Sequence, residues 1–199
     1  METSDTIIRF WFGEDTDDVA AAQEKSSLWW SKNPAVDAQM RERFLPCLDS
    51  AMRGELDAWK QVPAGRLALI LLADQFSRNI HRGTPLSFAS DPLARAWCKE
   101  GLPDGIDKTL RPIERVFFYM PLEHSESLED QERAVALFQA LAADVAPAYK
   151  PAFDDYVEFA IRHRDIIRRF GRFPHRNAIL QRQSSAEELT FLREPGSSF

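Results

Sequence analysis

Residues 64–83 read AGRLALILLADQFSRNIHRG, and the run LALILLA at 67–73 is apolar on every side of a helix. Such a run predicts a central, enclosed helix, because a surface helix would carry polar residues along one face. Asp74 and Arg78 continue the stripe that begins at Leu67. A carboxylate that faces a core is costly unless it is paired. We therefore predict that Asp74 contacts an arginine, in a structural ion pair or in a polar site at the mouth of the core.

Most of the local positive charge lies in residues 162–182, which read RHRDIIRRFGRFPHRNAILQR. Seven Arg and two His stand there against one acid, Asp165, so the segment carries +6 and the rest of a chain of net charge -6 carries -12. His163 shares the apolar stripe of this helix with Ile167. A histidine in that position is either a hydrogen-bonded core residue or a functional one. The charge asymmetry is the main pointer to function.

A turn is expected at Gly171, because glycine closes a helix in the left-handed conformation and the residue before Pro174 is pushed toward extended geometry. Proline also favours the first position of a new helix. The free N–H groups of such a helix would face the space between Arg172 and Arg176. We therefore expect both arginines to converge on an anion at this turn.

The length of 199 residues suits one domain, which we place at 1–193, followed by a mobile tail at 194–199 whose Phe199 could dock. Two cysteines, Cys47 and Cys98, argue against a disulfide scaffold and favour a reducing, cytoplasmic compartment. The sequence shows neither a secretory signal nor an apolar run of about 18 residues, so we expect no export and no membrane span. A pI of about 5.3 disfavours nucleic acid as a partner.

The pattern predicts an all-α fold, because alternating apolar runs bounded by hairpin turns are absent. We expect about eight helices packed as antiparallel pairs. The fullest apolar stripes lie at 64–80 and 148–170, so these two helices should be the most buried. Pro46 falls inside the stripe from Val36 to Met52, and it predicts a kink or a break there.

Several phrases along the chain are specific. They are FWFG at 10–13, LALILLADQFSRNIHRGT at 67–84, YMPLEHSE at 119–126, RFGRFPHRN at 169–177 and SSAEELTFL at 184–192. Together they resemble the bacterial family called domain of unknown function 924, nearly from end to end. The resemblance implies a tetratricopeptide-like α-α superhelix. It supplies no reaction and no catalytic residues, and binding in a concave groove follows only by analogy of fold.

We predict a binding module that recognises an anionic group of a small molecule or peptide. Arginine makes up 19 of the 25 basic residues, and its planar fork binds anions in a bidentate way. The residues expected to form the pocket are Asp74, Arg78, Arg82, His124, His163, Arg172, His175, Arg176 and Asn177.

Two other functions stay open. One is a hydrolase-type enzyme in which a histidine and a carboxylate act as acid and base, with or without a metal. Its candidate residues are His124, His163, His175, Asp74 and Glu126. The other is a structural interaction protein whose basic segment pairs with acidic stretches such as 123–132, within the chain or in a second copy. No phosphate-binding glycine loop or His-Glu-x-x-His signature is present, so no metal or other cofactor is predicted. The sequence leaves the oligomeric state open.

Overall fold

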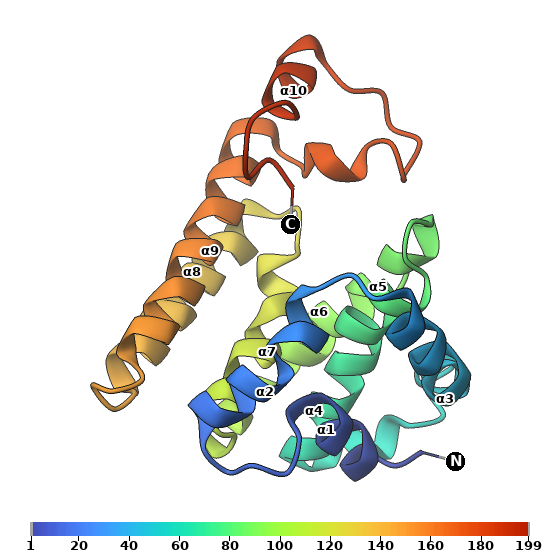
Figure 1. Ribbon diagram of the computed structural model, residues 1–199, viewed down its shortest axis with the longest axis vertical. Helices are drawn as coiled ribbons and strands as arrows, with labels where there is room; N and C mark the ends of the chain where they lie inside the picture. The colour runs from blue at the N-terminus through green and yellow to red at the C-terminus, as the bar shows by residue number, and fades with distance from the viewer. Residues whose placement is uncertain (1, 199) are drawn as a thin grey trace.

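The computed structural model of the protein describes residues 2–198, which form helices joined by turns (Figure 1). The α-helices are α1 (Ser4–Phe12), α2 (Asp18–Trp30), α3 (Pro34–Met52), α4 (Pro63–Ile70), α5 (Ser77–Ile80), α6 (Asp91–Gly101), α7 (Pro112–Glu123), α8 (Leu128–Asp144), α9 (Lys150–Phe170) and α10 (Ala186–Phe191). The shorter segments are η1 (Asp57–Gln61), the π-helical η2 (Leu71–Phe76), η3 (Pro85–Phe88), η4 (Ile106–Thr109) and η5 (Pro174–Arg176). No strand occurs among residues 2–198, and the all-α prediction is confirmed.

The predicted central helix is formed by α4, η2 and α5, which follow one another without a break. Every residue from 65 to 77 is buried, and α1, α3, α6 and α7 pack around them. The ring of Phe76 lies 4.8 Å from that of Phe44 on α3 and 5.3 Å from that of Trp11 on α1. Asp74 lies on the π-helical turn η2. Such turns inside α-helices are frequent at functional sites.

The second enclosed helix is α7, in which every residue from 116 to 123 is buried. The expectation that 148–170 would be equally enclosed is wrong, because α9 buries one stripe only. That stripe consists of Phe153, Ala160, His163, Ile166 and Ile167. Position explains the difference, since α7 packs against helices on several sides whereas α9 runs mainly along α8 (Figure 1).

Helices α3 and α9 contain the positions at which Pro46 predicted a kink or break and Gly171 predicted a helix end. α3 continues through Pro46, so no break occurs there. Its start is capped by Asn33, whose side chain accepts hydrogen bonds from the backbone N–H groups of Ala35 and Val36. α9 ends at Gly171 with a φ of 68°, the left-handed closure predicted from the sequence.

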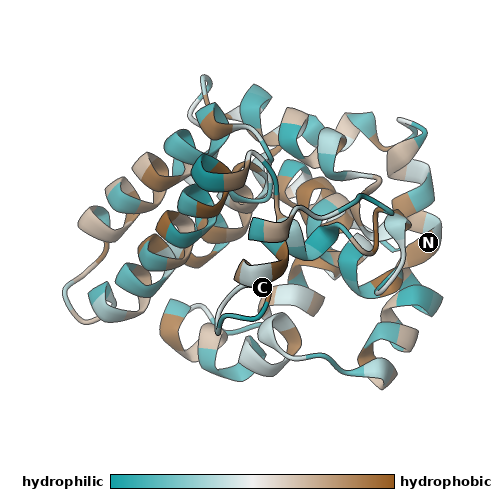
Figure 2. Cartoon of the chain, turned by 90° about the horizontal axis from the view of Figure 1, so that it is seen from above, coloured by the Kyte–Doolittle hydropathy of each residue, from teal (hydrophilic) through white to brown (hydrophobic). Residues whose placement is uncertain are grey.

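The buried apolar residues form two clusters. The larger cluster lies among helices α1 to α9, and Figure 2 shows hydrophobic and hydrophilic residues alternating along the outer helices, as one-sided burial requires. The smaller cluster consists of Ile166, Ile167, Phe173 and Phe191, with Phe170 packed against it. It ties the end of α9 to residues 171–198, which we call the C-terminal segment (Figure 1).

The sequence predicted a mobile tail at 194–199 and no membrane span. Of the tail expected at 194–199, Ser197 is buried and its hydroxyl donates to the carbonyl oxygen of Leu192, whereas Phe199 lies outside the described residues. No helix within residues 2–198 is long and apolar enough to cross a membrane.

Candidate functional site

Polar side chains from six elements meet beside the end of the central helix. They are Asp74 of η2, Arg78 of α5, Asp91 of α6, His124 at the end of α7, His163 of α9, and His175 and Arg176 of η5. We call these seven residues the polar cluster. Among them the sequence had singled out every residue except Asp91.

Asp74 is the most enclosed acid of the polar cluster, with 1% of its surface exposed. Its Oδ1 lies 2.7 Å from His124 Nδ1 and 3.3 Å from Arg78 Nη1, and its Oδ2 accepts a hydrogen bond of 2.6 Å from Gln75. Burial alone raises the pKa of this carboxyl, but Arg78 and His124 outweigh burial and the net pKa is lowered. The prediction that Asp74 contacts an arginine is confirmed.

His124 is held in one tautomer by Asp74. A carboxylate can only accept, so the short contact places the proton on Nδ1 and leaves Nε2 as an acceptor in the neutral ring. Burial lowers the pKa of His124 and outweighs the opposing effect of Asp74. At neutral pH the imidazole is therefore uncharged. Such a ring can take a proton from water or from a ligand.

His163 forms a second pair of imidazole and carboxylate. Its Nδ1 lies 2.9 Å from Oε1 of Glu123 and 2.8 Å from the carbonyl oxygen of Phe159. Both partners accept, so this Nδ1 also carries the proton. The rings of His163 and His124 are 6.2 Å apart between centroids. The polar cluster thus holds two oriented imidazoles side by side.

Arg176 is the least satisfied cation of the polar cluster. It is 6% exposed, its guanidinium lies over the rings of Phe88 at 4.8 Å and Phe173 at 4.4 Å, and its closest carboxylate oxygen, on Asp91, is 3.6 Å away. Asp91 is already bound by Arg78 through two hydrogen bonds of 2.8 and 3.1 Å. Within residues 2–198 the Nε of Arg176 is fully buried and has no hydrogen-bond acceptor.

Charges and burial shift the titration of both η5 side chains. Burial, helped by Arg78, lowers the pKa of Arg176 to about 10, so that it remains charged at neutral pH. Burial lowers the pKa of His175 to about 3, and Arg176, His163 and His124 contribute in the same direction. His175 is therefore neutral at pH 7.

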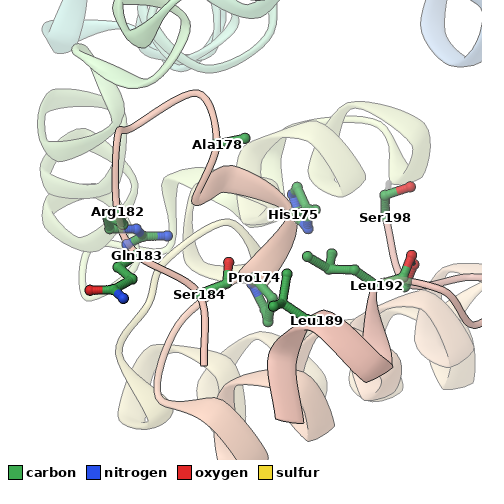
Figure 3. A pocket seen from close by; sticks show the side chains of 10 residues that line it. Pro174, His175, Ala178, Arg182, Gln183, Ser184, Leu189, Leu192 and Ser198 are labelled. Atoms are coloured by element: carbon green, nitrogen blue, oxygen red, sulfur yellow. Dashed lines mark hydrogen bonds between the residues drawn. The ribbon is translucent and has the colours of Figure 1, made fainter. Parts of the chain in front are cut away.

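His175 also lines a cavity of about 630 Å³, which is open to solvent (Figure 3). The other lining residues are Pro174, Ala178, Arg182, Gln183, Ser184, Leu189, Leu192, Ser197 and Ser198. Figure 3 shows the side chains of Pro174, Leu189 and Leu192 around the same space as His175. The volume falls in the range of small-molecule sites.

Glu126 fastens the C-terminal segment to the body of the protein. Its carboxylate accepts a hydrogen bond of 2.8 Å from the backbone N–H of Phe173 and two hydrogen bonds of 2.7 and 2.9 Å from Arg182. These donors lower its pKa despite its partial burial, which acts in the opposite direction. The sequence had suggested Glu126 as an acid or base, whereas the structure gives its carboxylate a bidentate arginine partner.

Three residues predicted for the pocket bind other partners and do not belong to the polar cluster. Arg82 forms a bidentate pair with Asp37, at 2.6 and 2.9 Å, and Arg172 forms one with Glu188, at 2.6 and 2.8 Å. The amide of Asn177 bonds to Arg182 and Ser184.

The expected convergence of Arg172 and Arg176 on one anion is wrong. Arg172 pairs with Glu188 of α10 instead. The helix that begins at Pro174 is a single 3-10 turn of 3 residues, too short to aim a row of free N–H groups. Arg176 instead crosses to Phe88 and Asp91 on the body.

The residues that sequence reasoning missed are the partners: Phe88, Asp91, Glu123, Phe173 and Arg182. Asp91 followed Ser90 and preceded Pro92, so its position at a helix start explained it without a function. Glu123 had a weak signal, since it directly precedes His124 in a polar phrase. No group of three or more His, Cys, Asp or Glu within residues 2–198 is arranged to hold a metal ion.

The fold and the polar cluster define an all-helical protein in which histidines, arginines and carboxylates are gathered beside a central helix. The chain belongs to the family described as bacterial protein of unknown function (DUF924), whose model matches residues 7–196. The resemblance seen in the sequence is thereby confirmed. The tetratricopeptide-like superhelix that it implied stays a prediction.

A solved structure supports the same conclusion. The chain is similar to a protein of unknown function, ATU0120, from Agrobacterium tumefaciens, with 39% sequence identity over 96% of each chain and a TM-score of 0.80. No curated protein matches the chain. The relationship gives the fold and the family, and the function has to be argued from the site.

Proposed function

We propose that this protein binds a small molecule or peptide through an anionic group at Arg176. The observation that carries the proposal is a buried arginine whose Nε has no hydrogen-bond acceptor within residues 2–198 and whose closest carboxylate oxygen lies 3.6 Å away. Guanidinium offers five N–H donors, and a buried donor left unsatisfied costs about 1–3 kcal/mol, more when it is charged. Contacts with Phe88 and Phe173 offset part of this cost. An anion would supply the acceptors that the protein withholds.

The neighbours of Arg176 support the proposal in a second way. Arg78 forms hydrogen bonds with both carboxylate oxygens of Asp91 and also pairs with Asp74, so Asp91 approaches Arg176 only to 3.6 Å, beyond hydrogen-bond distance. His124 and His175 are neutral at pH 7 because their pKa values are lowered. They would act as hydrogen-bonding groups for a ligand. Arg82, Arg172 and Asn177 have their own partners and are left out of the proposed site.

The test is thermal stability in the presence of small anions. Acetate, benzoate, phosphate and sulfate are compared with chloride at matched ionic strength, for the parent protein and for Arg176→Gln. An anion at 100 times its dissociation constant should stabilise the parent by about 2.7 kcal/mol, and the effect should vanish in Arg176→Gln.

Arg169→Gln is the matched control, since Arg169 is exposed and paired with Glu187 outside the polar cluster. It should respond to anions as the parent does. If no anion acts differently from chloride on the parent, the proposal fails. If Arg176→Gln keeps the whole response, the anion binds elsewhere.

A second candidate function is an acid–base enzyme, favoured by the contact of 2.7 Å between His124 Nδ1 and Asp74. A buried carboxylate that orients a neutral imidazole is the arrangement of a general base, and Nε2 would accept a proton from attacking water. The measurement is hydrolysis of p-nitrophenyl acetate and p-nitrophenyl phosphate. Activity that His124→Gln removes and the control His81→Gln keeps would support an enzyme. Equal rates in the two variants would reject this role of His124.

A further inference from the structure

We infer that the anionic group accepted at Arg176 is a planar carboxylate and not a phosphate or sulfate. The inference rests on the proposed function and narrows it to one ligand chemistry. It follows from the two aromatic rings that lie against the guanidinium and from the charges that surround it.

The shape follows from the two aromatic rings. The rings of Phe88 and Phe173 lie 4.8 and 4.4 Å from the guanidinium carbon, so they occupy space next to the face of the group. The N–H bonds of a guanidinium point outward in its plane. A ligand must therefore reach these N–H groups where the two rings do not cover them. A flat carboxylate can form two parallel hydrogen bonds there, whereas a tetrahedral oxyanion carries oxygens out of that plane.

The surrounding charges disfavour a second negative charge on the ligand. Asp91 lies 3.6 Å from Arg176, and Glu126 and Asp74 are also near enough to raise its pKa against the effect of burial. The other nearby cations are committed, since Arg78 pairs with Asp74 and Asp91, and Arg182 pairs with Glu126. A ligand with one negative charge pairs with Arg176, which forms no hydrogen bond with a carboxylate. The second negative charge of a dianion would be repelled by these carboxylates, and little water is present there to screen the repulsion.

The imidazoles do not change this balance at neutral pH. Burial keeps His124 and His175 uncharged, so they add donors and acceptors without adding positive charge. His163 lies against the carboxylate of Glu123. A phosphate dianion would require more than one cation that is not already paired with acids. In the polar cluster Arg78 is paired with Asp74 and Asp91, which leaves Arg176.

The experiment follows the Nε–H signal of Arg176 in proton–nitrogen correlation spectra of the full chain. Because this Nε is buried without an acceptor, its N–H should give a protected signal; Arg176→Lys identifies the signal by its loss. Acetate and sulfate are titrated separately at constant ionic strength. Acetate should shift the signal in a saturable way, with an affinity at least tenfold above that for sulfate.

The outcomes separate the two proposals. If sulfate binds as tightly as acetate, the carboxylate inference is overturned and the proposed function stands. If neither anion shifts the signal, both are overturned. Asp91→Asn tests the charge argument, because it should narrow the preference for acetate over sulfate severalfold, while the exposed control Asp165→Asn leaves it unchanged. An unchanged preference in Asp91→Asn would reject the charge argument, and the titration of the parent protein does not depend on either variant folding.

Discussion

His124 Nδ1 lies 2.7 Å from Asp74 Oδ1, although 50 residues separate them in the chain. The contact joins the π-helical turn of the central helix to the end of α7, the two most enclosed parts of the fold. Gln75 and Arg78 complete the surroundings of the same carboxylate. Asp74 therefore holds three neighbouring side chains of the site, Gln75, Arg78 and His124, in place.

Replacement of Asp74 by Ala should destabilise the protein by about 3–5 kcal/mol, because Arg78 and His124 would lose a buried partner. Chemical denaturation measures the change. The control is Asp154→Ala, since Asp154 is exposed and pairs only with Lys150 in the next helical turn, and its loss should leave stability nearly unchanged. Equal losses in the two variants would contradict the central place of Asp74.

Replacement of Leu71 by Ala should cost about 2–5 kcal/mol, since Leu71 has no exposed surface and its truncation leaves a cavity in the central helix. Leu86→Ala is the matched control, because Leu86 is 57% exposed on η3. It should change the free energy of unfolding by no more than about 0.5 kcal/mol. A loss below 1 kcal/mol at Leu71 would mean that neighbouring side chains collapse into the space.

The stability of the protein should fall as pH is lowered from 6.5 toward 3, in part because of His175. Its pKa is 6.5 as the reference value and about 3 in the fold, so between these values the unfolded chain binds a proton that the folded protein does not. The unfolded state is favoured in that window, by up to about 1.4 kcal/mol per pH unit. Above pH 6.5 both states are neutral at His175 and its effect disappears. The variant His175→Asn should flatten the pH profile of the melting temperature, whereas His81→Asn should flatten it less. A profile unchanged by His175→Asn would show that this histidine titrates normally.

Replacement of Glu126 by Ala should loosen the C-terminal segment without unfolding the body. The carboxylate holds Phe173 and Arg182, whereas the smaller apolar cluster holds the segment to the end of α9 only. Amide hydrogen exchange should accelerate at least tenfold within 171–198 and stay near the parent rate in α4 and α7. Glu187→Ala removes an exposed pair with Arg169 and should leave exchange unchanged. Faster exchange throughout the molecule would mean that the segment and the body open together.

Local pattern predicted most of the fold and part of the site. The run of apolar residues at 67–73 identified the central helix, and the same stripe placed Asp74 and Arg78 together. Gly171 predicted a left-handed helix end. These features depend on neighbours three or four residues away, which a sequence displays directly.

The remainder depended on long-range packing. Nothing local shows that Glu188 would take Arg172 or that Arg176 would cross to Phe88 and Asp91. The π-helical turn at 71–76 has no mark in the residue pattern, and the stripe of α9 could not reveal that only one side would be covered. Pairing among many arginines and acids is decided by which elements approach each other, and the sequence contains several equally good partners for each charge.

The burial of Arg176 has a consequence for the rate of binding. With 6% of its surface exposed, behind Phe88 and Phe173, it is not available to a ligand at every collision. Association would then proceed through a minor open form, so that the observed rate levels off at high ligand concentration at the rate of opening. Breaking the hydrogen bonds of Glu126 would be part of that opening, because this carboxylate fastens the chain on both sides of η5 through Phe173 and Arg182. The same closure that slows entry would slow escape, and a ligand of modest affinity would acquire a long residence time.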